Sequence, residues 1–194
     1  MQYGGLIMIY NLIAIIGEAG SGKDTIMREL VKQHPSLNEI VSYTTRPPRE
    51  GEKDGVNYHF VSGEEFGQMV VDGRMLEASC FNDWFYGTGT GSLDENKLNI
   101  GVFNPEGIDS LSMHKNINMT VIRVWASDKE RLLRQLNRES DPDVDEILRR
   151  FKTDREDFSD LGFKHYIVKN NSKEDFNEAI RLLNLVIKEY IGNN

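Results

Sequence analysis

The chain has 194 residues, a net charge of −8 and a pI near 5.1. This length predicts one domain, or one core with small inserted subdomains, and the acidic balance argues against nucleic acid and anionic membranes as partners. The single cysteine, Cys80, excludes an internal disulfide. The apolar stretch at 6–16 is too short to span a bilayer and lacks the basic flank of a secretion signal. We therefore expect a cytoplasmic protein.

A glycine-rich segment follows an apolar run at residues 12–16, and the run is typical of a strand buried on both faces of a parallel sheet. Glycines let backbone N–H groups turn toward phosphate oxygens, and the positive end of the next helix adds to the attraction. Lys23 would reach the β- and γ-phosphates of a nucleoside triphosphate. The predicted ATP-binding residues are Gly17, Glu18, Ala19, Gly20, Ser21, Gly22, Lys23, Asp24 and Thr25.

The last position of this segment departs from the Walker A pattern. It is normally Ser or Thr, whose hydroxyl binds Mg²⁺, and here it is Asp24. Either the Asp24 carboxylate binds the ion, directly or through water, or the phosphates hold the ion for the most part. Asp24 is therefore the candidate metal ligand, with Mg²⁺ as the expected ion.

The rest of the chain predicts alternating helices and strands. Predicted helices cover residues 23–34, 62–72, 105–111, 127–138, 144–158 and 174–190, and capping boxes begin two of them at Ser62 and Ser127. Predicted strands cover 12–16, 40–45, 58–61, 75–81, 100–103, 120–126 and 166–168, with a turn at 82–83. This alternation after a phosphate loop predicts an α/β fold with a central parallel sheet flanked by helices. The region 42–90, rich in short strands, interrupts the alternation and is interpreted as an insertion.

A more specific signal lies in two neighbouring segments. Residues 42–52 read Ser-Tyr-Thr-Thr-Arg-Pro-Pro-Arg-Glu-Gly-Glu, and residues 57–60 read Asn-Tyr-His-Phe. This pattern closely resembles guanylate kinase, and the similarity continues through Phe66, Glu77 and Tyr86-Gly87-Thr88 over nearly the whole chain. The resemblance implies an enzyme that transfers the γ-phosphate of ATP to GMP with the help of Mg²⁺. It also implies a P-loop kinase core at about 1–41, 92–136 and 152–194, a mixed α/β insertion that binds the nucleoside monophosphate at about 42–91, and a helical lid at about 137–151.

The resemblance further implies which residues bind the acceptor nucleotide. They are Ser42, Arg46, Arg49, Tyr58, Glu77, Tyr86, Thr88 and Asn104. Arg46, Arg49, Tyr58 and Tyr86 would clamp the 5′-phosphate, because guanidinium groups donate charge-assisted, bidentate hydrogen bonds to a dianion.

Within that set, Glu77 would recognise guanine. Its carboxylate would accept from N1–H and the 2-amino group, while Ser42 and Thr88 would donate to O6 and N7. Adenine would face the carboxylate with an acceptor at N1 and leave a buried charge unpaired. Flanking Leu76 and Ala78 leave open the alternative that Glu77 is an outward-facing strand residue.

Positive side chains would neutralise the transferring phosphoryl group. The resemblance assigns this role to Lys23, Arg46, Arg138 and one or both of Arg149 and Arg150, since the spacing does not decide between the last two. The acceptor phosphate is already anionic, so no general base is required. Catalysis would come from alignment, Mg²⁺ and donors that tighten when the lid closes.

Asn104 stands where the family usually has an aspartate, and Asp24 would offset the lost charge if it points the same way. These two departures favour ribose 1,5-bisphosphate phosphokinase as an alternative, whereas Glu77, Arg49 and Tyr58 favour an acceptor with a base. Other nucleoside monophosphate kinases and a non-catalytic peptide-binding module are further alternatives; the intact Gly22-Lys23 argues against the last. The sequence leaves open GMP against dGMP and monomer against homodimer. The expected partners are GMP and ATP, with no nucleic acid and no membrane.

Overall fold

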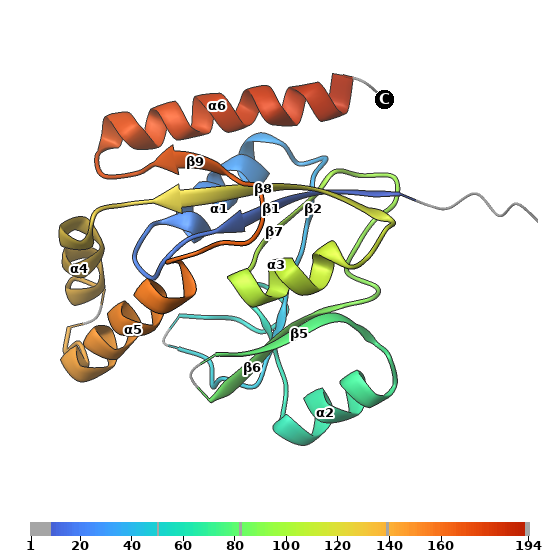
Figure 1. The fold of residues 1–194 in the computed structure, drawn as a ribbon, viewed down its shortest axis with the longest axis horizontal. Coiled ribbons are helices and arrows are strands. Elements are labelled where there is room, and N and C mark those ends of the chain that lie inside the picture. Colours follow the sequence, from blue (N-terminus) through green and yellow to red (C-terminus); the bar gives the residue numbers. More distant parts are fainter. Residues whose placement is uncertain (1–8, 50, 82, 139, 193–194) are drawn as a thin grey trace, which may run out of the picture.

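The computed structural model describes residues 9–49, 51–81, 83–138 and 140–192, which fold into two sheets surrounded by helices (Figure 1). Glu50, Asn82 and Glu139, which fall within predicted segments, lie outside these ranges. The main sheet has the order β2-β7-β1-β8-β9, and every neighbouring pair is parallel. Its strands are β1 (Tyr10–Ile16), β2 (Asn38–Glu39), β7 (Asn99–Val102), β8 (Ile117–Trp125) and β9 (Tyr166–Lys169). The predicted α/β class with a central parallel sheet is confirmed.

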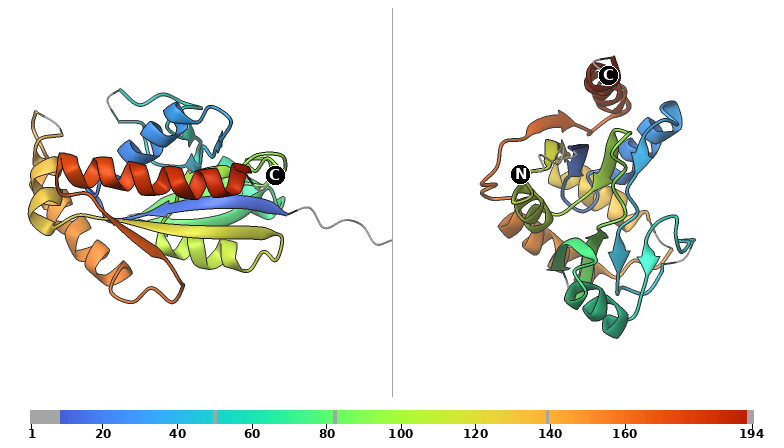
Figure 2. Two further views of the ribbon diagram at one scale, coloured as in Figure 1. Left: turned by 90° about the horizontal axis from the view of Figure 1, so that it is seen from above. Right: turned by 90° about the vertical axis from the view of Figure 1, so that its right-hand side faces the viewer.

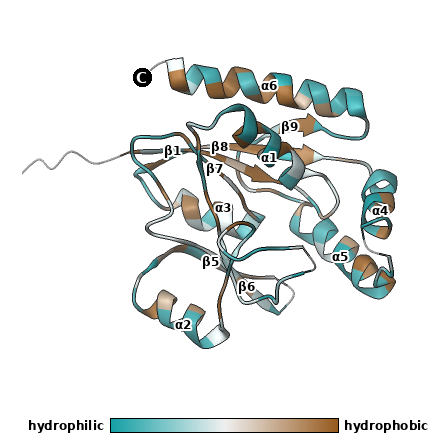
Figure 3. Ribbon diagram, turned by 180° about the vertical axis from the view of Figure 1, so that it is seen from behind, coloured by the Kyte–Doolittle hydropathy of each residue, from teal (hydrophilic) through white to brown (hydrophobic). Residues whose placement is uncertain are grey.

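Helices cover both faces of the main sheet. α1 (Lys23–Gln33) and α6 (Lys173–Gly192) lie on one face, and α3 (Pro105–Ser112) lies on the other. Figure 2 shows α6 running along the direction of β1 and β8. The central strands are hydrophobic while α5 and α6 alternate in hydropathy, as Figure 3 shows, because the strands are enclosed and each helix has a solvent face.

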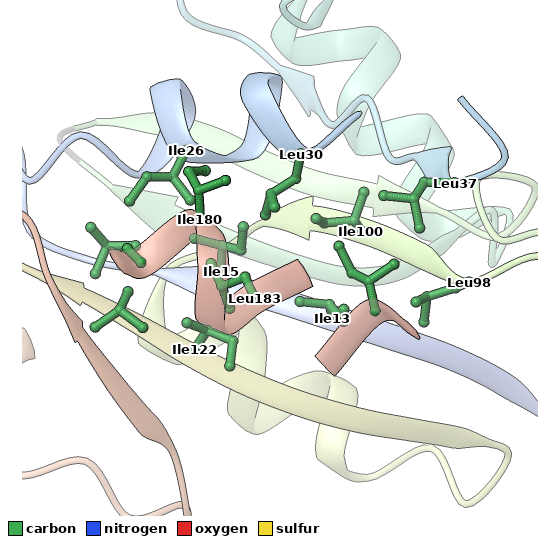
Figure 4. Packing of buried hydrophobic residues seen from close by; sticks show 14 residues of the cluster. Ile13, Ile15, Ile26, Leu30, Leu37, Leu98, Ile100, Ile122, Ile180 and Leu183 are labelled. Atoms are coloured by element: carbon green, nitrogen blue, oxygen red, sulfur yellow. The ribbon is translucent and has the colours of Figure 1, made fainter. Parts of the chain in front are cut away.

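Alternate residues of β1 enter two separate hydrophobic clusters. Ile13 and Ile15 pack with residues of α1 and α6, among them Leu30 and Leu183, as Figure 4 shows. The other side of β1 packs against α3 through residues that include Ile108. β1 is therefore fully buried along Leu12–Ile16, and the loop that follows it starts from a fixed support.

The second sheet has the order β4-β3-β6-β5 and falls within the region interpreted as an insertion. It contains β3 (Tyr43–Thr44), β4 (His59–Phe60), β5 (Met75–Phe81) and β6 (Trp84–Gly89). One face packs on α2 (Gly63–Val71), where Phe66 stacks on Phe85 at 5.6 Å between ring centroids. The register pairs Glu77 with Thr88 and Tyr86 with both Ser79 and Thr44, so these polar residues share the other face.

Two helices form an arm beyond the carboxyl ends of β8 and β9 (Figure 1). They are α4 (Asp128–Leu136) and α5 (Val144–Asp157), which contact each other. Ser127 caps α4, as Ser62 caps α2, by accepting from the backbone N–H three residues later. The arm is thus positioned at the same edge of the sheet as the glycine-rich loop.

All six predicted helices are confirmed to within a few residues, and the turn before β6 is marked by Asp83 with φ 61°. The predicted strand at 40–45 is wrong as a single element. Residues 38–39 pair with β7 in the main sheet, whereas residues 43–44 pair with β4 and β6 in the second sheet. The chain changes sheets between them, which local β propensity does not reveal. No helix in the described ranges is long and apolar enough to cross a bilayer.

Candidate active site

The glycine-rich loop joins β1 to α1 and closely approaches neighbouring elements. Gly20 has φ 80° and Gly22 has φ 89°, a region that strains residues with a Cβ. A Cβ on Gly22 would lie 2.3 Å from the side-chain amide of Asn170, so both conformation and space require glycine there. Gly22 precedes α1 without a side-chain cap. The N–H groups of Thr25 and Ile26 donate to the Gly22 carbonyl oxygen, so those of Lys23 and Asp24 at the start of α1 are the ones that can face an anion.

Side chains from elsewhere in the fold hold the carbonyl groups of this loop. Arg134 of α4 donates to the carbonyl oxygens of Gly20 (3.2 Å) and Ser21 (3.1 Å), and Asn170 donates to Ser21 (2.7 Å). In a trans peptide the C=O and the following N–H point in opposite directions. The N–H of Gly22 is therefore directed to the side away from Arg134, where a phosphate can approach.

Ala19 is held on both of its backbone groups. Arg131 Nε donates to its carbonyl oxygen at 3.0 Å, and its N–H donates to Asp154 Oδ2 at 2.9 Å. Arg131 and Asp154 also form an ion pair with each other. The loop is thus bonded to α4, α5 and the end of β9 at successive residues.

Lys23 and Asp24 begin α1 at the mouth of the loop. The Lys23 ammonium lies 3.9 Å from the Asp24 carboxylate, whose side chain is 55% exposed. Burial raises the pKa of Tyr58 above its ordinary value, and the negative charge of Asp24 raises it further, so Tyr58 stays protonated.

The structure offers few groups to a metal ion. In the part of the chain that it describes, no three His, Cys, Asp or Glu side chains form a metal-binding group. Mg²⁺ commonly keeps several waters and takes one or two carboxylates together with substrate phosphates. A single exposed carboxylate, that of Asp24, beside a phosphate loop fits this mode of binding.

Arg46 and Arg49 lie in the loop after β3, and Glu52 holds both. Arg46 Nη2 donates to both carboxylate oxygens of Glu52, at 3.0 and 2.8 Å, and the backbone N–H of Arg49 donates to the same carboxylate at 2.7 Å. The Arg46 guanidinium also lies 5.5 Å from the centre of the Tyr58 ring, and Tyr86 lies edge-on to that ring. The four side chains predicted to clamp a phosphate therefore belong to one region.

Positive charges from the helical arm converge on Arg49. Burial lowers the pKa of Arg49 most, and neighbouring positive charges lower it further. Those charges belong to Arg46, Arg150 and Arg138. Guanidinium groups from the second sheet and from the arm thus face one another, which is costly unless an anion lies between them.

The structure distinguishes Arg149 from Arg150. Both donate to Glu146, and these bonds lower the pKa of Glu146 to about 2, with Arg149 contributing most. Arg150 is the less exposed of the two and is near Arg49, whereas Arg149 is near Asp83. Arg150 therefore faces the guanidinium cluster directly.

Glu77 is buried, with 7% of its surface exposed. The Thr88 hydroxyl donates to Glu77 Oε1 at 2.8 Å, and burial raises the pKa of Glu77 to about 7. The alternative of an outward-facing residue is wrong, because β5 turns Glu77 toward α3. Ser42 lies one residue before β3, and continuing the pairing of Tyr43 with Gly87 sets Ser42 opposite Thr88.

Asn104 caps α3 beside Glu77. Its side-chain oxygen accepts from the N–H of Gly107 at 2.7 Å, and its amide nitrogen donates to Ser79 Oγ at 2.8 Å. A Cβ on Gly107 would lie 3.0 Å from Asn104 Oδ1 and 3.1 Å from Glu77 Oε2, so the amide and the carboxylate are neighbours. Asp24, which was expected to offset the negative charge missing at Asn104 if it points the same way, lies beside Lys23 at the start of α1.

The sequence profile of guanylate kinases matches residues 10–190 of this chain. The chain belongs to the guanylate kinase family. A guanylate kinase of Clostridium perfringens is 32% identical over 181 residues, which cover 91% of this chain and 83% of that protein. A guanylate kinase of Thermosynechococcus vestitus is 51% identical over 77 residues, 40% of each chain. The crystal structure of guanylate kinase from Anaplasma phagocytophilum has the same fold, with a TM-score of 0.68 and 21% identity over 94% of this chain and 87% of that one.

The sequence did not indicate several residues of this guanylate kinase family member whose hydrogen bonds hold the candidate site in place. They are Glu52, Ser79, Arg131, Arg134, Asp154 and Asn170. The period of a strand could have found Ser79, since it lies two residues after Glu77. The contacts of Arg134 and Asn170 join segments far apart in the chain, and no local pattern indicates them.

Proposed function

We propose that this protein transfers the γ-phosphate of ATP to GMP, and also to dGMP, giving ADP and GDP or dGDP. The observation that carries the proposal is the buried Glu77 carboxylate, hydrogen-bonded to Thr88, on the face of the second sheet that turns toward the core. A buried carboxylate needs donors to compensate its lost hydration. Guanine offers two adjacent donors, N1–H and the 2-amino group, which match its two oxygens.

On the donor side, ATP is held by its phosphates. The N–H of Gly22 and the first turn of α1 bind the β-phosphate region, and the Lys23 ammonium binds the β- and γ-phosphate oxygens. Asp24 holds Mg²⁺ together with the phosphates and water. The ion supplies positive charge that stabilises the transferring phosphoryl group.

On the acceptor side, the 5′-phosphate of GMP occupies the guanidinium cluster. Arg46, already fixed by Glu52, and Arg49 donate to it, with the hydroxyls of Tyr58 and Tyr86 as further donors. A bound phosphate attracts guanidinium groups that otherwise repel each other. This attraction favours an arrangement in which the arm lies close to the loop that carries Arg46 and Arg49.

Arg138 and Arg150 approach the transferring group from the arm, with Arg149 beside them. Their charges stabilise the phosphoryl group as it passes between two oxygens. The acceptor oxygen is an anion, so alignment and charge suffice without a general base. Ser42 donates to the O6 and N7 edge of guanine. The one proton of the Thr88 hydroxyl goes to Glu77 in the protein without nucleotide, and Thr88 donates to guanine by giving up that bond. Asn104 lies next to the base site, bonded to Ser79.

The proposal extends to the organisation of the chain. Residues 42–91 form the insertion that binds the monophosphate, residues 137–151 form the lid, and the remainder forms the core. GMP and ATP are the small-molecule partners of a protein that works in the cytoplasm.

An ADP-release assay over a panel of acceptors tests the proposal. The panel contains GMP, dGMP, AMP, dTMP and ribose 1,5-bisphosphate, with Lys23→Ala and Glu77→Gln as control variants. We expect turnover with GMP and dGMP, loss of turnover with Lys23→Ala, and loss of preference for guanine with Glu77→Gln. Turnover of ribose 1,5-bisphosphate alone would contradict the proposal, and so would the absence of turnover with every acceptor.

A further inference from the structure

Arg131 and Asp154 form an ion pair that is almost wholly enclosed. Their side chains are 3% and 5% exposed, and they come from α4 and α5 respectively. The Phe151 ring lies under the Arg131 guanidinium at 4.4 Å. Burying two charges costs several kcal/mol each in hydration, and well-packed apolar residues often stabilise a fold equally well. Stability alone therefore does not account for this pair.

The pair does what apolar residues could not do, because it bonds both backbone groups of one residue of the phosphate loop, Ala19, and so holds two successive peptide units. Arg131 Nε donates to the Ala19 carbonyl oxygen at 3.0 Å, and the Ala19 N–H donates to Asp154 Oδ2 at 2.9 Å. The Ala19 carbonyl is thereby turned toward α4. The next N–H, that of Gly20, points to the opposite side and joins the donors that can face phosphate.

The same two helices carry the arginines that face the acceptor loop. Arg138 follows α4 and Arg150 lies on α5. The positive charges of both lower the pKa of Arg49. A displacement of either helix would therefore pull on Arg131 or Asp154 and disturb the backbone at Ala19.

We propose that Arg131 and Asp154 are positioning residues that hold the phosphate loop in its ATP-binding conformation and couple it to the arm formed by α4 and α5. The inference rests on the proposed function, since it assumes that the loop binds the phosphates of ATP. It predicts that loss of the pair weakens ATP binding without a matching loss of stability or of GMP binding.

The test uses the full chain with Arg131→Met and Asp154→Leu combined, which replaces the pair by apolar groups of similar size. Three quantities are measured: the melting temperature without nucleotide, and the Kd values for ATP with Mg²⁺ and for GMP by titration calorimetry. We expect an unchanged or higher melting temperature, a Kd for ATP raised about 10-fold, and a Kd for GMP within twofold of the unmodified protein.

A matched control and a conservative variant complete the experiment. Arg155→Met breaks the exposed ion pair of Arg155 with Asp128, which also joins α5 to α4. Asp128 keeps its bond to Arg131 at 3.1 Å in this variant, so the bonds of Arg131 and Asp154 to Ala19 stay in place and both Kd values should be unchanged. Asp154→Asn keeps an acceptor for the Ala19 N–H, and it should bind ATP with an affinity between those of the double variant and the unmodified protein. If the double variant does not fold, the ATP affinity of Asp154→Asn alone tests the inference.

Equal ATP affinity in the unmodified protein, the double variant and Asp154→Asn would overturn this inference. So would an equal loss of ATP and GMP affinity together with a lower melting temperature, because that result indicates a purely structural pair. Normal ATP binding without any phosphorylation of GMP would contradict the proposed function instead, and the comparison of ATP affinities would still decide the role of the pair.

Discussion

The Thr88 hydroxyl donates a hydrogen bond to the Glu77 carboxylate at 2.8 Å, and both side chains are buried. The bond satisfies one carboxylate oxygen and leaves the other, Oε2, beside the start of α3. Burial without full compensation raises the pKa of Glu77 to about 7. Recognition of guanine is therefore linked to the ionisation of one carboxyl group near neutral pH.

Glu77→Gln should lower kcat/KM for GMP about 100-fold, because the amide offers one acceptor where the carboxylate offers two charged ones. The measurement is steady-state ADP release at pH 8 with GMP as the varied substrate. KM for ATP serves as the internal control and should stay within twofold. An increase in KM for ATP without a decrease in kcat/KM for GMP would contradict the assignment of Glu77 to the base.

Ionisation of Glu77 should make the protein without nucleotide less stable as pH rises. The folded-state pKa of about 7 lies above the ordinary value of 4.5, so the folded protein binds this proton more tightly than the unfolded chain. The resulting contribution is full below pH 4.5 and is lost as pH rises through 7, by about 3 kcal/mol in total. Denaturant unfolding at pH 5.5 and pH 8, compared with Glu77→Gln, should show about 2 kcal/mol of this loss, because part of it has already occurred at pH 5.5. Equal pH dependence in the two proteins would contradict the prediction.

Thr88→Val should raise the pH at which GMP binds well. The hydroxyl donates to the carboxylate and holds the pKa of Glu77 down, and valine has nearly the same volume but no donor. The profile of KM for GMP against pH should move to higher pH by about one unit. Thr90→Val, on an exposed residue just after β6, is the matched control. An unchanged midpoint with a uniformly higher KM would mean that the hydroxyl acts only on the nucleotide.

Asn104→Asp should weaken GMP binding at pH 7 and recover part of it at higher pH. An aspartate can still cap α3, so we expect little change in stability. It would, however, add a negative charge next to Glu77 and raise the pKa of that residue. Ser79→Ala, which removes the other partner of Asn104 without adding charge, separates the two effects. Tighter GMP binding by Asn104→Asp at pH 7 would contradict this expectation.

Asp24→Ala should raise the concentration of free Mg²⁺ needed for half-maximal activity about 10-fold, because the variant removes the exposed carboxylate that lies beside Lys23 at the mouth of the loop. The measurement is the rate against free Mg²⁺ at saturating ATP and GMP. Asp24→Ser, which introduces the hydroxyl of the Walker A pattern, should have a Mg²⁺ requirement between those of Asp24→Ala and the unmodified protein. An unchanged Mg²⁺ requirement in both variants would mean that the phosphates hold the ion without Asp24.

The sequence predicted features that depend on neighbouring residues. The helices, the capping serines and the buried strand before the phosphate loop follow from periodicity and turn chemistry over short windows. The split of residues 38–44 between two sheets was missed, because strand pairing is decided by distant partners. For the same reason the contact of Arg134 with Gly20 was not predicted. Glu52 and Arg46 are six residues apart, and their contact was missed because it depends on the irregular path of the loop between them.

The ratio of kcat/KM for GMP to that for AMP, measured with the unmodified protein and with Glu77→Gln, tests the central claim most directly. A purine-sensing carboxylate predicts a ratio of at least about 100 in the unmodified protein and a drop of at least tenfold in the variant. A ratio near one in the unmodified protein, or the same high ratio in both proteins, would contradict the role given to Glu77.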